Sequence, residues 1–550
     1  MELIDRHTKY IMEGCKERAR DAGLRFEDES LEYIVTNRDL LELSPKLMIP
    51  TLYDYWVHDV EVLKERGKYE LYPGNPYETV INTRPAISFY NDNNPDWLNV
   101  MIFYHVLGHI DFFQNNLFFR HTWDYDFNGQ ALSDKRLIAR LRSEKGRWVD
   151  YVIEFARGID NQVGYHDELA RMDRPLPHGR SLQLDYYFDV FLQTDHSVST
   201  HEYIQEIESY NDFIRKYGQL GEESFFAAVS RKYPEFDSAF EKYKHRENKE
   251  RMDLMQFVLE HSAFLNRAEN RWMKSIIQVV RNTSLFFQPQ IRTRIMNEGW
   301  ASYWHETLFL QDDRIAGHEV DYARVNAGVT ALSRVGVNPY ALGMRLFYYI
   351  EEMADKGKLS MAFKMMADEG NRGRFDTKAG GGREKIFNVR ENFCDFMFIN
   401  TFVDQDFVNR HRLFVVGTRL NQDKTAWEYY VRSRKAEAYR NMLADSLYHP
   451  PHIEIDTKRT ARNGTLQLVH RFEGKPLVRD FIANTMMGIE FLWGGPVKLD
   501  TREIVSSPHG DLRPSDRDPS GLISTVSEDD IVWQDVCYTM TNRKLSKETL

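Results

Sequence analysis

The chain has 550 residues, a net charge of −11 and a hydrophobic fraction of 42%, which supply a large core and exclude global disorder. A mildly acidic chain is a poor polyanion binder, so we expect no nucleic-acid partner. Three cysteines without CxxC spacing exclude a disulfide scaffold and a cysteine zinc cluster.

The N-terminal segment carries charges every few residues and has no apolar core of the kind that secretory signals contain. No stretch of 18 or more apolar residues occurs anywhere in the chain. We therefore expect a cytoplasmic protein without a membrane span.

Apolar residues recur at spacings of three and four over most of the chain before residue 445, and this period predicts helices. An exception is the segment 79–92, which is β-branched at its start and predicts a strand followed by an extended loop. Asn338-Pro339 predicts a helix start, with proline in the first turn. We assign residues 1–445 to one large helical body.

The pattern changes after residue 450. The runs HIEIDTKR and TLQLVHRF alternate apolar and polar residues around Asn463-Gly464, a two-residue hairpin signal. A helical stretch and the short strand PVKLD follow, so we expect a small α+β unit at 446–505. Residues 506–550 are polar and contain three prolines, which predicts a loosely ordered tail. The predicted fold is mainly α, with this small C-terminal α+β unit.

The first candidate site is the pair His105 and His109. Residues at i and i+4 lie about 40° apart on a helix, so both imidazoles point to one side. The HExxH helices of zinc enzymes present two ligands in this way. Such pairs also occur by chance, so the spacing alone is a weak signal.

The second candidate is the run NEGWASYWHE, which contains Glu298 and His305 on one helical face. It resembles the helix that supplies the third zinc ligand, a glutamate, in the gluzincin group of aminopeptidases. His105, His109 and Glu298 would then form a His₂Glu zinc site with an open position for water. The same ligand set also suits non-haem iron.

One position departs from the HExxH pattern. The general base of those enzymes occupies the place of Val106, which cannot accept a proton. His305 is therefore the candidate proton-transfer residue or fourth ligand, and Glu306, offset by about 80° on the helix, ranks below it.

Three polar residues follow the histidine pair in the sequence. Asp111, Asn115 and Asn116 are candidates for orienting His109. Helix capping or exposure to solvent explains them equally well.

With both motifs in view, the chain resembles the stage V sporulation protein R (SpoVR-like) family. The matching segments are YETVINTRPAISF, HVLGHIDFFQNN, FFQPQIRTRIMNEGWASYWHETL, NPYALG, HRLFVV, GTLQLVHRFEGKPL and LWGGPVKL. The resemblance implies a bacterial cytoplasmic protein linked to spore formation. In non-sporulating bacteria it implies a gene beside that of a serine protein kinase, which makes the kinase and its operon neighbours candidate partners. The segment after His109 departs from the family pattern, so the chain looks like a divergent member.

Three functional hypotheses remain open at this point. The first is a zinc-dependent hydrolase of an amide bond in a peptide or a peptidoglycan-related substrate, acting in spore or envelope formation or in a stress response. The second is a non-catalytic scaffold or kinase partner that keeps a degenerate metal site. The third is a non-haem iron protein. Neither the substrate nor the oligomeric state follows from the residues alone.

Overall fold

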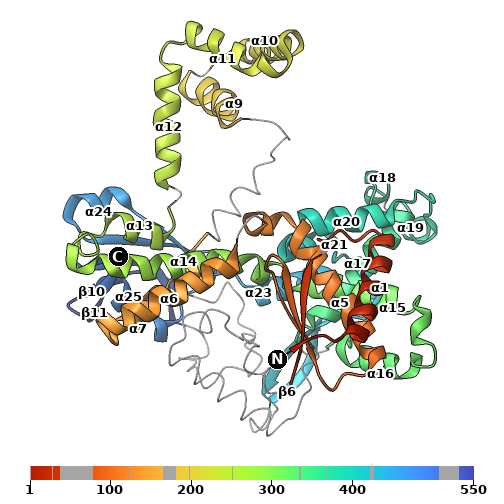
Figure 1. Cartoon of the computed structure of the whole chain (residues 1–550). Helices are drawn as coiled ribbons and strands as arrows, with labels where there is room; N and C mark the ends of the chain where they lie inside the picture. The colour runs from red at the N-terminus through yellow and green to blue at the C-terminus, as the bar shows by residue number, and fades with distance from the viewer. Residues whose placement is uncertain are drawn as a thin grey trace.

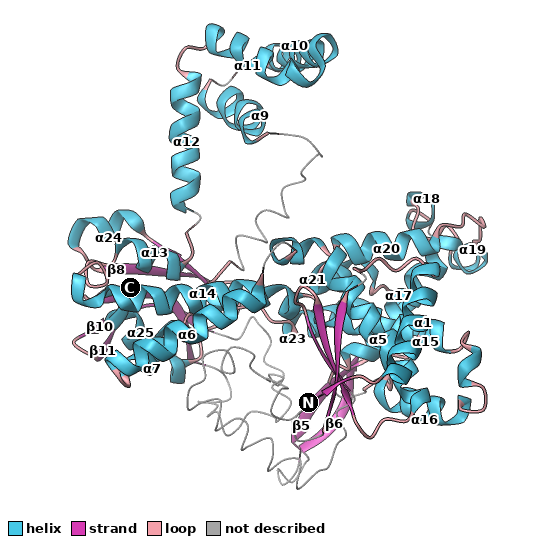
Figure 2. Cartoon of the chain, in the orientation of Figure 1, coloured by secondary structure: helices cyan, strands magenta, loops and turns pink. Residues whose placement is uncertain are grey.

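The computed structural model describes residues 2–27, 29–36, 78–123, 126–164, 181–196, 198–250, 252–333, 336–366, 368–420, 427–506 and 532–550. Helices dominate these residues, and a small α+β unit lies at the C-terminal end (Figure 2). The predicted fold class is confirmed. Among the described residues, no helix has the length and apolar character needed to cross a membrane.

The largest apolar core surrounds the two motif-bearing helices. A four-stranded sheet lies beside it in the order β1-β2-β4-β3, with β2 and β4 parallel and the other pairs antiparallel. Its strands are β1 (Glu2–Leu3), β2 (Ser30–Val35), β3 (Glu78–Ile81) and β4 (Ala86–Asn91). The helices of this region are α1 (Arg6–Asp21), α5 (Asp96–Asn115), α15 (Arg294–Phe309), α16 (Glu319–Val329), α17 (Pro339–Asp355), α18 (Met361–Lys364), α19 (Glu369–Arg374), α20 (Gly382–Asn392), α21 (Asp395–Phe402), α22 (Gln405–Arg410) and α23 (Ala436–Ser446). Short 3₁₀ turns (Leu117–Thr122 and Asp313–Ile315) and the ribbon of β5 (Val415–Leu420) and β6 (Trp427–Ser433) complete it.

Helix α15 lies between α5 and α17, and glycines allow the close approach on both sides. A Cβ atom added to Gly108 of α5 would lie 2.7 Å from the Ala301 Cα of α15. On the opposite face of α15, a Cβ on Gly299 would lie 2.4 Å from the Gly343 Cα of α17. Real Cβ atoms do not tolerate such distances, because protein interiors are close-packed and resist overpacking. The glycines of both sequence motifs are therefore helix-crossing points.

A second apolar core lies around the C-terminal sheet, whose strand order is β11-β10-β9-β8-β7. In Figure 1 the long helix α14 runs from this core toward the first one. The strands are β7 (His452–Ile455), β8 (Leu466–Arg471), β9 (Val497–Ser506), β10 (Val532–Thr541) and β11 (Lys544–Thr549). The helices are α6 (Phe127–Lys145), α7 (Trp148–Arg157), α13 (Leu254–His261), α14 (Arg271–Arg292), α24 (Thr457–Asn463) and α25 (Arg479–Trp493), with 3₁₀ turns at Asp160–Gln162 and Ala268–Asn270.

A third, aromatic-rich core belongs to an arm that projects from the rest of the molecule (Figure 1). Its elements are α9 (Leu182–Asp185), a π-helix (Tyr186–Asp195), α10 (Thr200–Tyr217), a 3₁₀ turn (Gly218–Leu220), α11 (Gly221–Lys232) and α12 (Phe236–Glu250). At its centre the Tyr187 ring contacts Phe225 and Phe236 edge-on, and Phe226 stacks on Phe236.

The structure differs from the predicted loosely ordered tail. Residues 532–549 form β10 and β11, an antiparallel pair that extends the C-terminal sheet. The alternation of Val536, Tyr538 and Met540, all buried, drives this pairing, and the three prolines that suggested disorder precede it. The part of the prediction that covers residues 507–531 lies outside the described residues.

The predicted hairpin is correct in its pairing and wrong in its turn. Strands β7 and β8 pair antiparallel, but the connection contains helix α24. Gly464 caps this helix in the left-handed conformation with φ +71°, which is the common role of glycine at a helix C-terminus. The Asn-Gly pair therefore ends a helix rather than forming a two-residue turn.

The helix crossing yields a direct test of stability. Gly343→Ala would place a methyl group 2.1 Å from the Ile295 carbonyl oxygen, so we expect it to lower the free energy of unfolding by about 1–3 kcal/mol or more. Gly328→Ala is the matched control, since this exposed helical glycine has no atom within 4 Å of its added Cβ. The control should be neutral or stabilising by up to about 1 kcal/mol. Urea unfolding of both variants measures the contrast, and equal effects would contradict the crossing geometry.

Candidate metal centre

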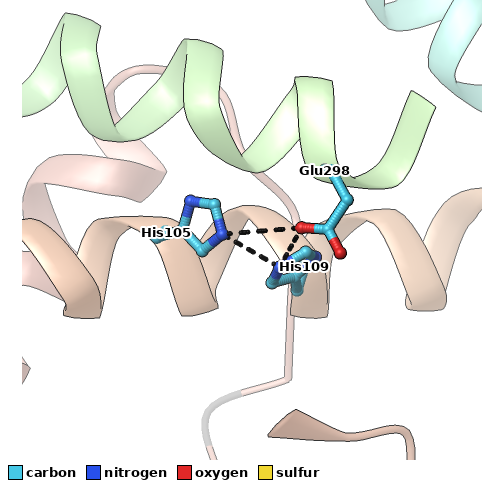
Figure 3. A group of neighbouring side chains, drawn as sticks. All are labelled: His105, His109 and Glu298. Atoms are coloured by element: carbon cyan, nitrogen blue, oxygen red, sulfur yellow. Dashed lines mark hydrogen bonds and ion pairs between the residues drawn. The ribbon is translucent and has the colours of Figure 1, made fainter. Parts of the chain in front are cut away.

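Two helices supply the three candidate ligands. His105 and His109 lie one turn apart on α5, and Glu298 faces them from α15 (Figure 3). The structure thus brings together residues separated by almost 190 positions in the chain. The exposed fractions of the two imidazole side chains are 8% and 6%, and that of the Glu298 side chain is 20%, although its Oε2 atom is buried.

The ligand atoms converge on one point. The Nε2 atoms of His105 and His109 are 3.1 Å apart, and they lie 3.9 Å and 3.5 Å from Glu298 Oε2. Three atoms bound to one tetrahedral zinc at about 2.0–2.2 Å would be about 3.4 Å from one another. The spacing of the three atoms therefore fits a single metal ion, and within the described residues this is the one group of three that meets the geometric requirement.

Burial shapes the electrostatics of the cluster. It lowers the pKa of His105 well below the usual range, and the neighbouring His109 and His305 lower it further. Burial also raises the pKa of Glu298 to about 7, against opposing effects of the Tyr340 hydroxyl and of Arg294. Glu298 Oε2 is buried and accepts no hydrogen bond, which is rare for a carboxylate oxygen. A bound cation would satisfy this oxygen.

The first turn of α15 carries Glu298 and also contacts His109. The carboxylate of Asp395 accepts hydrogen bonds from the Ile295 and Met296 amides at 2.8 and 2.9 Å, which holds the first turn of α15. Asn297 lies next to the ligand, and its Oδ1 is 2.9 Å from His109 Nδ1. The same turn of α15 therefore supplies one ligand and orients another.

Tyr340 contacts two of the three candidate ligands, His105 and Glu298. Its ring stacks on His105 with centroids 6.0 Å apart, and its hydroxyl hydrogen bonds the Glu298 carboxylate. The predicted helix start places it there: Asn338 accepts a hydrogen bond from the Ala341 amide, and Pro339 is the first residue of α17. This predicted helix start is confirmed.

His305 contacts His105 on the side opposite Glu298. The two Nδ1 atoms are 2.9 Å apart, and His305 Nε2 is 2.9 Å from Asn326 Oδ1. Burial lowers the pKa of His305 to about 4. The Asn326 amide in turn donates to Glu306 Oε2 at 2.9 Å, and the Tyr348 hydroxyl donates to Oε1 at 3.3 Å. The two candidate catalytic residues therefore belong to a chain that reaches the cluster through His105.

The three residues predicted near His109 have other partners. Asp111 accepts from the Arg25 amide at 2.7 Å and from the Trp300 indole at 2.8 Å. Asn115 donates to the Arg25 carbonyl at 2.7 Å. Asn116 donates to the Arg390 carbonyl at 2.7 Å and accepts from the Phe118 amide at 3.0 Å. These contacts join α5 to its neighbours, and Asn116 caps the start of the 3₁₀ turn Leu117–Thr122.

Val106, at the position of the missing base, is fully buried in the apolar core. Residues that the sequence did not single out for the site are Asn297, Asn326 and Tyr340. Asn297 precedes Glu298 in the NEGWA run, and Tyr340 lies in the NPYALG segment, so both were within reach of motif reasoning. Asn326 comes from α16, whose sequence carries no comparable signal.

Fold and site together define a mainly-α protein with a His₂Glu cluster held between crossed helices. The sequence model described as SpoVR like protein matches residues 4–449, and the chain belongs to the SpoVR-like family. It is also similar to the uncharacterized protein YcgB of Escherichia coli (strain K12), with 23% identity over 495 residues, covering 85% of this chain and 86% of that protein. No solved structure matches significantly.

The buried state of His305 predicts a pH-dependent stability. An unfolded histidine titrates near 6.5, whereas burial lowers the pKa of His305 to about 4. Between these values the unfolded chain binds a proton that the folded chain does not, so the free energy of unfolding rises with pH. In chelator-treated protein, the difference between wild type and His305→Asn should fall by on the order of 3 kcal/mol from pH 7 to pH 4. Urea unfolding at both pH values tests this, and an unchanged difference would contradict a neutral, buried His305.

Proposed function

We propose that this protein is a metal-dependent hydrolase of amide bonds in a peptide or peptidoglycan-related substrate, with zinc bound by His105, His109 and Glu298. The observation that carries the proposal is the buried Glu298 Oε2 atom. It accepts no hydrogen bond and lies 3.5 and 3.9 Å from two imidazole nitrogens. Leaving a carboxylate oxygen desolvated in this way is costly unless a cation is close.

The composition of the ligand set supports a catalytic rather than a structural ion. Two histidines and a glutamate would leave a fourth tetrahedral position for water, and a zinc ion held by these three residues would acidify that water and polarise a substrate carbonyl. The Tyr340 hydroxyl beside Glu298 is the protein group best placed to hydrogen bond a polar substrate atom there.

His305 is poorly suited to the role of general base for water. Its ring is fully buried, both of its nitrogens have partners, and the low pKa of about 4 makes it a weak proton acceptor at neutral pH. Its contact with His105 Nδ1, the ring nitrogen that faces away from Glu298, supports a positioning role instead. On this proposal the Tyr340 hydroxyl, which hydrogen bonds the Glu298 carboxylate, is the protein group placed to handle the proton.

The second candidate is a non-catalytic scaffold or partner of a serine protein kinase that keeps the metal site. The fully buried Val106 at the position of the usual base favours it. A third candidate, a non-haem iron protein, uses the same ligands. Metal identity separates the zinc and iron proposals, and chelator-sensitive hydrolysis separates enzyme from scaffold.

Metal analysis tests the proposal directly. Protein purified without a histidine tag should contain about one zinc ion per chain by mass spectrometry. Glu298→Gln keeps the size of the side chain but loses the anionic ligand. Metal affinity should therefore fall at least about 100-fold, which is more than the usual loss on removing a residue that only hydrogen bonds a ligand. Glu269→Gln, at an exposed glutamate in a 3₁₀ turn, is the matched control and should retain the metal.

The outcomes separate the hypotheses. Wild-type protein that binds no zinc or iron would end the metal proposal. Zinc binding without hydrolysis of any peptide or muropeptide in a substrate screen would favour the scaffold. Hydrolytic activity that a chelator abolishes and zinc restores would support the enzyme.

A further inference from the structure

We infer that Glu306, acting through Asn326 and His305, fixes the tautomer of His105 so that its lone pair lies on Nε2, the nitrogen that faces Glu298. The hydrogen-bond geometry that carries this inference does not depend on a metal. Its consequence for metal affinity rests on the proposed function. It gives Glu306, Asn326 and His305 the role of positioning residues.

The chain of hydrogen bonds has one consistent direction. The Glu306 carboxylate accepts at both oxygens, from the Asn326 amide at 2.9 Å and from the Tyr348 hydroxyl at 3.3 Å. Because Nδ2 of Asn326 must point toward this carboxylate, Oδ1 points toward His305 Nε2, 2.9 Å away. An amide oxygen only accepts, so His305 carries its hydrogen on Nε2.

The second half of the chain follows from the chemistry of imidazole. A neutral imidazole has one N–H group, so His305 Nδ1 is an acceptor. That atom lies 2.9 Å from His105 Nδ1, which must therefore be the donor. The Ala301 carbonyl also hydrogen bonds His105 and stabilises an N–H group on this ring. The lone pair of His105 is left on Nε2.

The second histidine ligand is oriented separately but with the same result. Asn297 Oδ1 lies 2.9 Å from His109 Nδ1, so the hydrogen is on Nδ1 and the lone pair on Nε2. The two Nε2 atoms face each other at 3.1 Å. Two lone pairs at this distance, beside a carboxylate oxygen, repel one another unless a cation lies between them. The positioning chain thus prepares the cluster for a cation before one binds.

The residues that orient His105 come from helices α15 and α16. His305 and Glu306 are neighbours on α15, and Asn326 on α16 bridges their side chains. Asn326 and the rings of His105 and His305 are buried, so water does not compete strongly for these groups. The half-buried Glu306 carboxylate therefore determines which nitrogen of His105 carries the hydrogen, although the two side chains are not in contact.

The test uses nitrogen NMR of protein labelled with ¹⁵N-histidine, because ¹⁵N shifts distinguish Nδ1–H from Nε2–H. The His105 signals are assigned by their loss in His105→Gln, and the protein is treated with chelator. Wild type should show the Nδ1–H tautomer at His105. Glu306→Gln should give a mixture of tautomers, since the side-chain amide that replaces the carboxylate lets Asn326 turn and present Nδ2 to His305.

An exchange of groups provides the rescue. The double variant Glu306→Gln/Asn326→Asp moves the carboxylate from α15 to α16 and the amide from α16 to α15. The relocated carboxylate accepts from His305 Nε2 and from the relocated amide, which restores the original direction. The double variant should recover the wild-type tautomer, and a role in packing alone would not produce this recovery. Tyr348→Phe removes a neighbour of Glu306 outside the chain and should leave the tautomer unchanged.

Zinc titration gives the second readout. The zinc dissociation constant should rise about 10–100-fold in Glu306→Gln and return toward wild type in the double variant. An Nε2–H tautomer at His105 in wild type, or an unaltered tautomer in Glu306→Gln, would overturn the inference whether or not metal binds. Wild type with the expected tautomer and no affinity for zinc would overturn the proposed function alone.

Discussion

The close crossing of α15 with α5 on one face and α17 on the other is the constraint on which the site depends. Backbone contact at Gly108 and Ala301 brings the turn that carries His109 within ligand distance of Glu298. Contact at Gly299 and Gly343 brings the first turn of α17, and with it Tyr340, over the same cluster. A side chain at any of these glycines would move one wall of the site away from the others.

Packing this tight leaves little room for water, so the polar groups between the helices must satisfy one another. Most of them do. Asp395 holds the α15 amides, Asp111 holds the Trp300 indole, and Asn326 joins His305 to Glu306. Among the described residues, the Ser302 hydroxyl and the Trp304 indole of α15 are buried without a hydrogen-bond partner, and so is Glu298 Oε2. Unlike these neutral groups, Glu298 Oε2 is a carboxylate oxygen that faces two imidazole nitrogens, and this distinguishes the cluster from an ordinary buried polar network.

Periodicity and motif spacing were sufficient to predict the mainly-α fold and the helices that carry His105, His109 and Glu298. The roles of glycine and asparagine residues do not follow from the sequence pattern, because these roles depend on what lies across a helix interface. Asn463-Gly464 ends a helix instead of forming a hairpin turn, and the strands at 532–549 follow a proline-rich segment that suggested disorder. The helical period predicts that Glu298 and His305 share one face of a helix. It does not predict that His305 contacts His105 Nδ1, the ring nitrogen that faces away from Glu298. Asn326 could not be foreseen at all, since its role arises from the packing of α16 against α15.

X-ray absorption spectroscopy at the zinc edge, on tag-free protein, would report both whether His105, His109 and Glu298 hold a zinc ion and which ligands surround it. We expect two imidazole nitrogens and carboxylate or water oxygens at about 2.0–2.2 Å, and in His105→Ala either a loss of bound zinc or one imidazole ligand fewer. Protein without bound metal, or a zinc shell containing sulfur or unchanged in that variant, would contradict zinc binding by these residues.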